Sequence, residues 1–344
     1  MISEMQKLLK HTVTSKASDL HISTGSPLMI RVNGAMQQID EKAITKETAT
    51  KLIHQILTQE QIAVIEKNHE IDFSLDIPDT GRFRANVFDQ RQGIGAVFRV
   101  ISQNIMSLEE LGLPKVIKDL IELDSGLILV TGPTGSGKST TLAAMINRIN
   151  CSREGHIITI EDPIEYLHES KKCLVNQREV GSTTHSFANA LRSALREDPD
   201  YILVGELRDL ETISLALTAA ETGHLVFGTL HTTSAPKTVT RVIDVFPAGE
   251  QDRIRIQLSE SIQGVIAQRL YPRKDKPGRV AAYEILIATQ AVRNLVREKK
   301  IFQIESIIQT SRQIGMQNME QSKRRLVSEG KLDAEYLKER LTLY

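Results

Sequence analysis

The chain has 344 residues, of which 40% are hydrophobic and 25% are charged, and this is the composition of an ordinary globular protein. At roughly 150 residues per domain, the length predicts about two domains. The composition excludes disordered, collagen-like and fibrous proteins. The 43 basic and 43 acidic residues give a formal net charge of zero, so the chain lacks the global basic excess of many nucleic-acid binders. A local basic patch is still compatible with this count.

Membrane insertion and secretion are not expected from the sequence. No uninterrupted apolar stretch reaches the roughly 18 to 20 residues that a membrane helix needs, and residues 1–10 lack the apolar core of a secretory signal. We therefore expect a soluble protein that stays in the cytosol. Cys151 and Cys173 have no CxxC partner, so we expect ordinary small core residues instead of a disulfide framework or a zinc site.

Residues 1–101 are predicted to form a small α/β domain with two hairpins. Asn33 and Gly34 tolerate positive φ and mark the first hairpin turn, and Gln92-Gly93 marks the second. Residues 102–114 contain few β-forming residues and end in a proline, so we expect a linker there. The predicted strands lie at residues 19–23, 28–32, 35–39, 71–77, 82–90 and 94–101, and a helical pattern covers residues 45–67.

From Gly126 onward the pattern changes to strand, turn and helix, repeated. The strands are continuous apolar runs, which is typical of strands buried on both faces of a parallel sheet. This alternation predicts a doubly wound α/β core within residues 115–344, with its ligand beyond the carboxyl ends of the strands. Strands are predicted at 127–131, 157–160, 201–204 and 225–229, helices at 139–150, 187–196 and 210–222, and a helical region over about 248–344 with helices at 250–270, 290–300 and 317–329.

The segment from Gly132 to Ser139 fits the phosphate-loop motif G-x-x-x-x-G-K-[ST] between a predicted strand and a predicted helix. Small residues let backbone N–H groups surround a β-phosphate, and the helix N-terminus adds about half a positive charge. Lys138 is expected to reach the β- and γ-phosphates, and Ser139 to bind Mg²⁺. The predicted nucleotide-binding residues are Gly132, Pro133, Thr134, Gly135, Ser136, Gly137, Lys138, Ser139 and Thr140.

Acidic residues follow two of the other predicted strands, and hydrolysis needs such groups to hold the metal and orient water. Gly205 stands where a Walker B aspartate is usual, so the adjacent Glu206 is the predicted catalytic base or water-positioning residue and a metal anchor. Glu161 and Asp162 are predicted to support Mg²⁺ and water. Which acidic residue is the base stays open, and for each of them a helix cap or a solvated charge is the alternative.

Two histidines flank the strand predicted at residues 225–229. A histidine at a strand end can hydrogen-bond a γ-phosphate or a catalytic carboxylate, and so report nucleotide state to the next element. His224 and His231 are therefore candidate site residues, with a satisfied structural histidine as the alternative.

These segments resemble the motifs of a known family. Residues 132–140, 158–166, 195–209 and 221–232 are similar to the Walker A motif, aspartate box, Walker B motif and histidine box of the secretion ATPases of the type II and type IV pilus class. Within that family, residues 16–21 (KASDLH), 168–180 and 291–298 look like signatures of the pilus retraction ATPases. Pilus extension ATPases commonly carry a four-cysteine zinc site and a long N-terminal extension, and this chain shows neither.

The resemblance implies a ring-shaped homohexamer with a PAS-like N-terminal domain and a RecA-like core, which hydrolyses ATP at subunit interfaces to disassemble a type IV pilus. Two N-terminal arginines reach the nucleotide in such relatives, and the matching positions here are Arg84 and Arg99. The implied partners are an inner-membrane pilus platform protein, at the inner face of the cell membrane, and a second retraction ATPase. Direct contact with nucleic acid is not implied.

The segment from Ala291 to Glu298 is predicted to be an amphipathic helix. One stripe is apolar, and the arginines and the glutamate are predicted to be more exposed, so a packing helix with a solvated face is the simplest interpretation. The resemblance links this segment to retraction rather than to hydrolysis. Its residues are Ala291, Val292, Arg293, Asn294, Leu295, Val296, Arg297 and Glu298, with Val292, Leu295 and Val296 on the apolar stripe.

Two other functions fit the same core. A nucleic-acid translocase is disfavoured by the zero net charge, the absence of tryptophan and the absence of an obvious basic-aromatic stripe. A GTPase switch is disfavoured because no NKxD-like segment that reads guanine is present. Both alternatives can be tested by titration with DNA and by comparison of ATP with GTP turnover.

Overall fold

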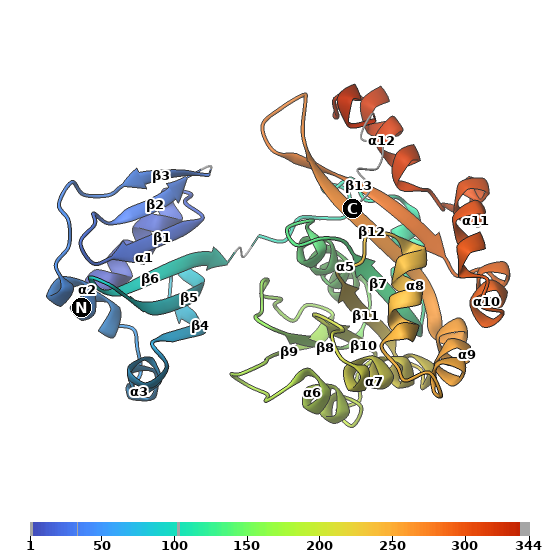
Figure 1. Ribbon diagram of the computed structural model, residues 1–344, viewed down its shortest axis with the longest axis horizontal. Helices are drawn as coiled ribbons and strands as arrows, with labels where there is room; N and C mark the ends of the chain where they lie inside the picture. The colour runs from blue at the N-terminus through green and yellow to red at the C-terminus, as the bar shows by residue number, and fades with distance from the viewer. Residues whose placement is uncertain (1–2, 33, 102–103, 338–344) are drawn as a thin grey trace. The chain divides into compact units, whose positions relative to one another are not determined.

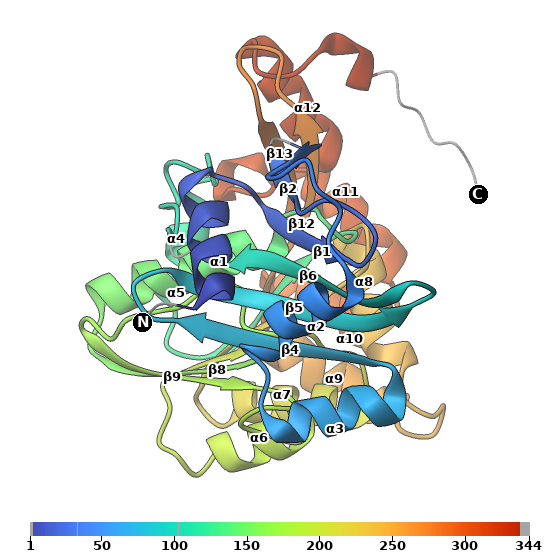
Figure 2. The same ribbon diagram turned by 90° about the vertical axis from the view of Figure 1, so that its left-hand side faces the viewer.

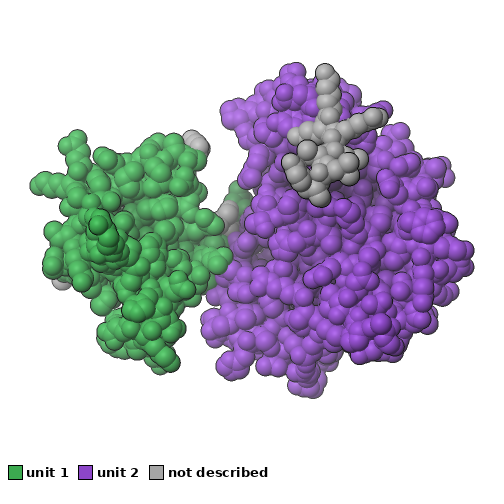
Figure 3. Space-filling model, in the orientation of Figure 1, with its two compact units in different colours: residues 1–104 green, residues 105–344 purple. Residues whose placement is uncertain are grey.

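The computed structural model describes residues 3–32, 34–101 and 104–337, and the chain divides into two compact units. Unit 1 comprises residues 1–104 and unit 2 residues 105–344 (Figure 3). The division falls inside the segment 102–114 for which the sequence predicts a linker. Helices long and apolar enough to cross a membrane are not found in the described residues.

Unit 1 is an antiparallel sheet with helices packed on one face (Figure 2). Its order is β3-β2-β1-β6-β5-β4, and the core forms where Leu20, Phe83 and Phe98 meet the apolar residues of the helices. The strands are β1 (Asp19–Ser23), β2 (Met29–Val32), β3 (Ala35–Gln38), β4 (Glu70–Ile77), β5 (Gly81–Gln90) and β6 (Gly93–Ile101), and the helices are α1 (Glu4–Thr14), α2 (Lys46–His54) and α3 (Gln59–Asn68).

The helices of unit 1 differ from the sequence-based expectation. The single helix predicted over residues 45–67 is two helices, because Thr58 caps α3 through a reciprocal pair of hydrogen bonds with Gln61. Helix α1 was not expected, and Ser3 caps it in the same way. The first hairpin forms between β2 and β3 with Gly34 at φ 87°, whereas Asn33 lies outside the described residues.

Unit 2 is built on a mixed sheet in the order β13-β12-β7-β11-β10-β8-β9 (Figure 1). From β12 to β9 neighbouring strands run parallel, and only β13 runs antiparallel to its neighbour within the described residues. The strands are β7 (Gly126–Thr131), β8 (Gly155–Glu161), β9 (Cys173–Glu179), β10 (Tyr201–Val204), β11 (Leu225–Leu230), β12 (Ile262–Pro272) and β13 (Arg279–Ile287).

Helices cover both faces of this sheet. The apolar residues of β7 alternate: Leu127 and Leu129 pack on one side, while Ile128 and Val130 pack on the other. Helices α4 (Val116–Ile121) and α5 (Lys138–Ser152) cover the face of Ile128 and Val130. The opposite face is covered by α6 (Phe187–Ala194), α7 (Leu210–Glu221), α8 (Ala235–Asp244), α9 (Gln251–Ser261), α10 (Gln290–Arg297) and α11 (Ile304–Thr310).

The C-terminal region is not purely helical, and this corrects the prediction of a helix over residues 250–270. Helix α9 ends at Ser261, and the chain continues directly as β12, which pairs with β7 on one side and β13 on the other. Val265, Ile266 and Ala267 are fully buried, so this run faces apolar surroundings on both sides of the sheet. The last regular α-helix described is α12 (Met319–Ser328).

The two cysteines have different environments. Cys173 is buried at the start of β9, as expected of a core residue. Cys151 is exposed near the end of α5, where its Sγ lies 3.3 Å from Lys171 Nζ, so the prediction of a core residue is wrong for Cys151.

Replacing Phe227 by Ala tests how much the central strand β11 contributes to unit 2. The Phe227 side chain is fully buried, so truncation should lower the free energy of unfolding by about 3 to 5 kcal/mol. Phe302→Ala is the matched control, because Phe302 is 76% exposed in the same unit and its truncation should change stability by less than about 0.5 kcal/mol. Denaturant unfolding measures both, and equal losses would contradict the packing described here.

Candidate active site

The loop between β7 and α5, the P-loop, has the backbone shape that its glycines require. Gly132, Gly135 and Gly137 have φ values of 147°, 74° and 89°, a region that residues with a Cβ rarely adopt. A Cβ on Gly132 would also lie 2.4 Å from the carbonyl oxygen of Gln268. The loop therefore brings its backbone close to neighbouring groups at the carboxyl end of β7, directly before the N-terminus of a 15-residue helix.

Lys138 begins α5 and points back over this loop. Its Nζ donates to the carbonyl oxygens of Gly132 (2.9 Å) and Pro133 (3.3 Å). Burial lowers the pKa of Lys138, while the charges of Glu206 and Glu165 oppose that shift. Lys138 and Glu206, which belong to separate sequence motifs, thus influence one another electrostatically.

Glu206 follows β10, and its carboxylate contacts a guanidinium group and an imidazole ring. Its Oε2 accepts a hydrogen bond from Arg208 (2.7 Å), and its Oε1 lies 3.1 Å from His231 Nε2. Burial raises the pKa of Glu206, but Arg208 and His231 outweigh it and hold the pKa below its ordinary value. Arg208 also lies 4.0 Å from Asp162 Oδ2, so it connects the Walker B strand with the aspartate box.

Glu161 ends β8 and has the opposite electrostatic environment. Burial raises its pKa to about 7, although Thr159 and Gln177 donate hydrogen bonds to Oε1 at 2.7 and 3.3 Å. A carboxyl group with a pKa near neutrality can both accept and release a proton at physiological pH. The environments of the two carboxyl groups therefore shift their pKa values in opposite directions.

Strand β9 positions the aspartate box, a role that the sequence analysis missed. Gln177 donates to Glu161 and to the carbonyl oxygen of Tyr166, and the carboxylate of Glu179 accepts from the backbone N–H of Ile164 (3.0 Å). Both side chains lie on one face of β9 because they are two residues apart. That spacing within the segment 168–180 was the available signal. Tyr166 in turn places its hydroxyl 2.9 Å from Thr140 Oγ1 on α5.

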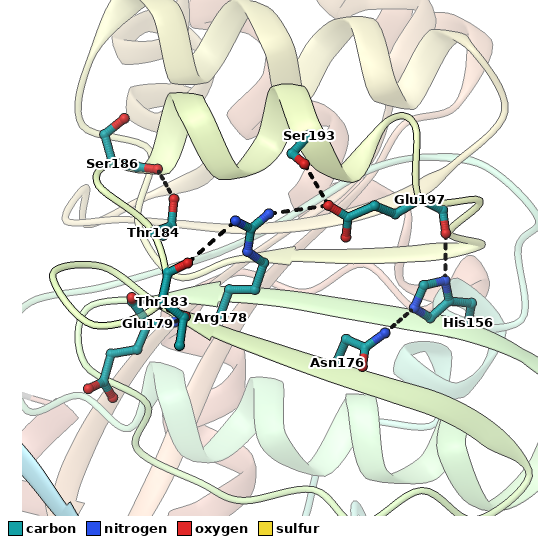
Figure 4. A network of polar contacts seen from close by, with 9 residues as sticks. All are labelled: His156, Asn176, Arg178, Glu179, Thr183, Thr184, Ser186, Ser193 and Glu197. Carbon is teal, nitrogen blue, oxygen red and sulfur yellow. Dashed lines mark hydrogen bonds and ion pairs between the residues drawn. The ribbon is translucent and has the colours of Figure 1, made fainter.

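The alternate residues of β9 attach the strand to its surroundings (Figure 4). Arg178 donates to Glu197 Oε1 at 3.2 Å, and Ser193 of α6 donates to the same oxygen at 2.7 Å. Asn176 contacts the His156 ring at 2.8 Å, and that ring reaches the carbonyl oxygen of Glu197. This network fixes an edge strand that has β8 as its neighbour in the described sheet.

The two candidate histidines lie at opposite ends of β11. This corrects the prediction that both belong to the nucleotide site. His231 follows the carboxyl end and contacts Glu206. His224 precedes the amino end, where its ring nitrogen lies 2.9 Å from the carbonyl oxygen of Ala219. Because the sheet is parallel here, His224 lies at the edge remote from the P-loop, and the structure does not bring it to the site within this chain.

In unit 1, Arg84 of β5 lies directly opposite Arg99 of the neighbouring strand β6. Residues opposite one another share a face, and like charges in that position repel. Asp19 compensates, since Arg99 Nε donates to its buried carboxylate at 2.9 Å, while Arg84 lies 3.7 Å from Asp72. Both guanidinium groups remain about half exposed or more, on the face of the sheet opposite to α1, α2 and α3.

Helix α10 contains most of the segment 291–298. Arg293 was predicted to be among the more exposed residues of this segment, but its guanidinium group is bonded within the chain. Its guanidinium donates to the carbonyl oxygens of Ser259 (2.8 Å) and Glu260 (2.6 Å) at the end of α9, and to Gln263 Oε1 (2.8 Å) of β12. Val292 and Val296 are fully buried, and Leu295 is partly buried, as predicted. The exposed residues are Ala291, Asn294, Arg297 and Glu298.

The residues at the carboxyl edge of the parallel strands suit a hard divalent cation that binds together with the phosphates of a nucleotide. Ser139 lies in the first turn of α5, and the carboxylates of Asp162 and Glu206 follow β8 and β10 at the same edge of the sheet. No group of three His, Cys, Asp or Glu side chains within the described ranges could hold a metal by itself. Mg²⁺ commonly takes one or two protein oxygens and completes its shell with phosphates and water. The oxygen donors present fit that pattern.

Comparison with known proteins agrees with these features. The family described as "T2SSE: Type II/IV secretion system protein" matches residues 1–339. The "Type IV pilus retractation ATPase PilT" of Pseudomonas aeruginosa is 54% identical over 98% of each chain. A "Twitching motility protein" of Neisseria gonorrhoeae is 54% identical over 95% of this chain and 87% of its own. The crystal structure of the pilus retraction motor PilT with bound ADP superposes with a TM-score of 0.92 at 46% identity, covering 100% of this chain and 98% of that one.

Substituting Glu161 by Gln tests the raised pKa. With a pKa of about 7 in the folded state against an ordinary 4.5, the folded chain keeps a proton that the unfolded chain releases. The contribution of Glu161 to the free energy of unfolding therefore decreases as the pH rises from its ordinary pKa to its raised pKa. The stability of Glu161→Gln relative to the unsubstituted protein should increase from about pH 5 to about pH 8, measured by denaturant unfolding with EDTA and without nucleotide.

The control for this measurement is Glu165→Gln, which removes an exposed carboxyl group from the same turn. Its difference from the unsubstituted protein should vary less with pH than that of Glu161→Gln. A difference for Glu161→Gln that is constant across the range would contradict the described environment.

Proposed function

The chain belongs to the type II/IV secretion system protein family, and we propose that within this family it is an ATPase that retracts type IV pili and so drives twitching motility. The observation that carries the proposal is the 54% identity with the Pseudomonas aeruginosa retraction ATPase over 98% of both chains. The architecture supports it, because the superposition with the ADP-bound retraction motor extends over the whole of this chain.

The nucleotide is ATP, bound at the P-loop. The N-terminus of α5 and the backbone N–H groups of Gly137 and Lys138 would face the phosphates, and Lys138 would turn from its carbonyl partners to the β- and γ-phosphates. Mg²⁺, when bound, neutralises charge that develops on the phosphates. Ser139 would hold it directly, with Asp162 and Glu206 oriented toward its water shell.

Hydrolysis requires a residue that orients or deprotonates the attacking water. Glu206 stays ionised beside Arg208 and His231 and is the proposed water-positioning residue. Glu161, with a pKa of about 7, is able to take up a proton at the same edge of the sheet. Two carboxylates with separated pKa values thereby divide the tasks between them.

The working assembly is proposed to be a homohexamer with ATP at the subunit interfaces. In this arrangement unit 1 is the PAS-like N-terminal domain and unit 2 the RecA-like core. Arg84 and Arg99 present two neighbouring guanidinium groups for a nucleotide. An arginine that contacts the γ-phosphate typically raises the rate of phosphoryl transfer by about 10³- to 10⁵-fold. Movement of the N-terminal domain against the core then converts hydrolysis into mechanical work.

The proposed partner is an inner-membrane pilus platform protein, with the ring docked at the cytoplasmic face of that membrane. Helix α10 carries the segment that the family resemblance links to retraction. Ala291, Asn294 and Arg297 of the helix and Glu298 directly after it are exposed and are proposed to contact the partner, whereas Arg293 is engaged within the chain. A second retraction ATPase is a further proposed partner.

Two substitutions separate binding from turnover. Lys138→Ala should reduce ATP hydrolysis by at least about 100-fold, because the main cation for the β- and γ-phosphates is lost. Glu206→Ala should bind ATP as before and turn it over at least about 100-fold more slowly. Lys276→Ala, in the exposed loop between β12 and β13, is the control. Steady-state hydrolysis and nucleotide titration measure both steps, and normal activity in both site variants would remove the site assignment.

Deletion of the gene tests the direction of action. Cells without a retraction motor should keep excess surface pili that do not retract and should lose twitching, as counted by electron microscopy and scored by spreading on agar. The wild-type gene should restore both properties, and the Glu206→Ala gene should restore neither. Cells without pili would instead indicate a role in assembly.

A further inference from the structure

The side chain of Gln268 lies against the P-loop, although no motif in the sequence points to it. Strand β12 pairs in parallel with β7, and Ala267 is opposite Thr131, the last residue of β7. Gln268 is therefore next to Gly132, where the chain leaves the strand and enters the loop. Its side chain is 1% exposed, so the amide has exchanged water for partners within the protein.

Both ends of this amide are bonded to the nucleotide-binding segment. Nε2 donates to the carbonyl oxygen of Ser136 at 2.6 Å, and Oε1 accepts from Thr141 Oγ1 at 2.9 Å. Ser136 lies in the loop and Thr141 lies in the first turn of α5. One buried side chain from a different strand thus connects the loop to the helix that follows it.

The bond to Ser136 determines the orientation of a peptide group. In a planar trans peptide the C=O and the N–H point in opposite directions. Because the Ser136 carbonyl is directed at Gln268, the N–H of Gly137 is directed away from Gln268. Backbone N–H groups of a P-loop are the groups that hold the β-phosphate.

We propose that Gln268 is a positioning residue of the ATPase, which holds the Ser136–Gly137 peptide in the orientation that presents the Gly137 N–H to the phosphates. Gln268 does not itself contact nucleotide in this role. Thr141 contributes by holding the amide in the orientation that directs Nε2 at Ser136. The inference rests on the proposed ATPase function and assigns a residue outside its recognised motifs.

Gln268→Met is the main test, because methionine fills a similar volume without a donor or an acceptor. Free to rotate, the Ser136–Gly137 peptide should lose its alignment with the phosphates. The KM for ATP and the Kd for ADP should therefore rise about tenfold, while kcat changes less than about threefold, since the lost interaction serves ground state and transition state alike. Unchanged nucleotide affinity would overturn the proposal.

Thr141→Val provides an independent readout that a purely structural role would not produce. If Thr141 acts through the amide, this variant should raise KM, Thr141→Ser should restore it, and the double variant with Gln268→Met should be no worse than Gln268→Met alone. Multiplicative effects of the two changes would overturn the proposed mechanism. Should Gln268→Met fail to fold, the Thr141→Val and Thr141→Ser pair decides, and a normal KM in Thr141→Val would overturn the proposal.

Gln263→Met is the matched control on the same strand. Gln263 Nε2 donates to the carbonyl oxygen of Ser125, before the amino end of β7, and its Oε1 accepts from Arg293. The same substitution therefore removes one donated and one accepted hydrogen bond, as in Gln268→Met, but far from the loop. Its nucleotide affinity should equal that of the unsubstituted chain. These measurements use the purified full chain and need only ATP hydrolysis and nucleotide binding. If the protein hydrolysed ATP but did not retract pili, the proposed function would be wrong, and the role of Gln268 could still be tested.

Discussion

The parallel pairing of β7, β11, β10 and β8 is the constraint on which the site depends. Parallel strands in register end at the same edge of a sheet, so whatever follows each strand is delivered to one place. The P-loop, His231, Glu206 and Glu161 follow these four strands in that spatial order, although they span almost a hundred residues of sequence. Strands β7, β10 and β11 are buried along their whole length, as is typical of the centre of a parallel sheet.

The polar residues at that edge divide into groups with opposite environments. Glu206 sits between Arg208 and His231, which keep its carboxylate charged, and Glu161 is withdrawn from water between β8 and β9, which raises its pKa to about 7. The difference arises from burial and neighbours, because the two side chains are chemically identical. Arg208 contacts the Glu206 carboxylate and Gln177 contacts that of Glu161, while Glu179 holds the backbone of the aspartate box through Ile164.

Strand β12 is hydrogen-bonded to two regions of unit 2 that lie far apart in the sequence. Near its beginning Gln263 accepts from Arg293 of α10, and near its other end Gln268 is bonded to the P-loop and α5. Helix α10 and the P-loop are therefore both hydrogen-bonded to side chains of one strand.

Sequence alone determined the features that depend on local chemistry. The P-loop, the buried strands of the core and the acidic strand ends were all predicted, because glycine conformations, apolar runs and parallel topology follow from short segments. Tertiary structure decided the rest. His224 and His231 flank the same predicted strand, and the direction of that strand separates them. Residues 262–270 look like a continuing helix, and pairing with β7 and β13 makes them part of a strand. Gln268 and Arg293 have no local signal for the contacts they make, and Gln177 has only its two-residue spacing from Glu179. A hydrogen bond to a residue more than a hundred positions away, or to a neighbouring element, depends on how the elements pack.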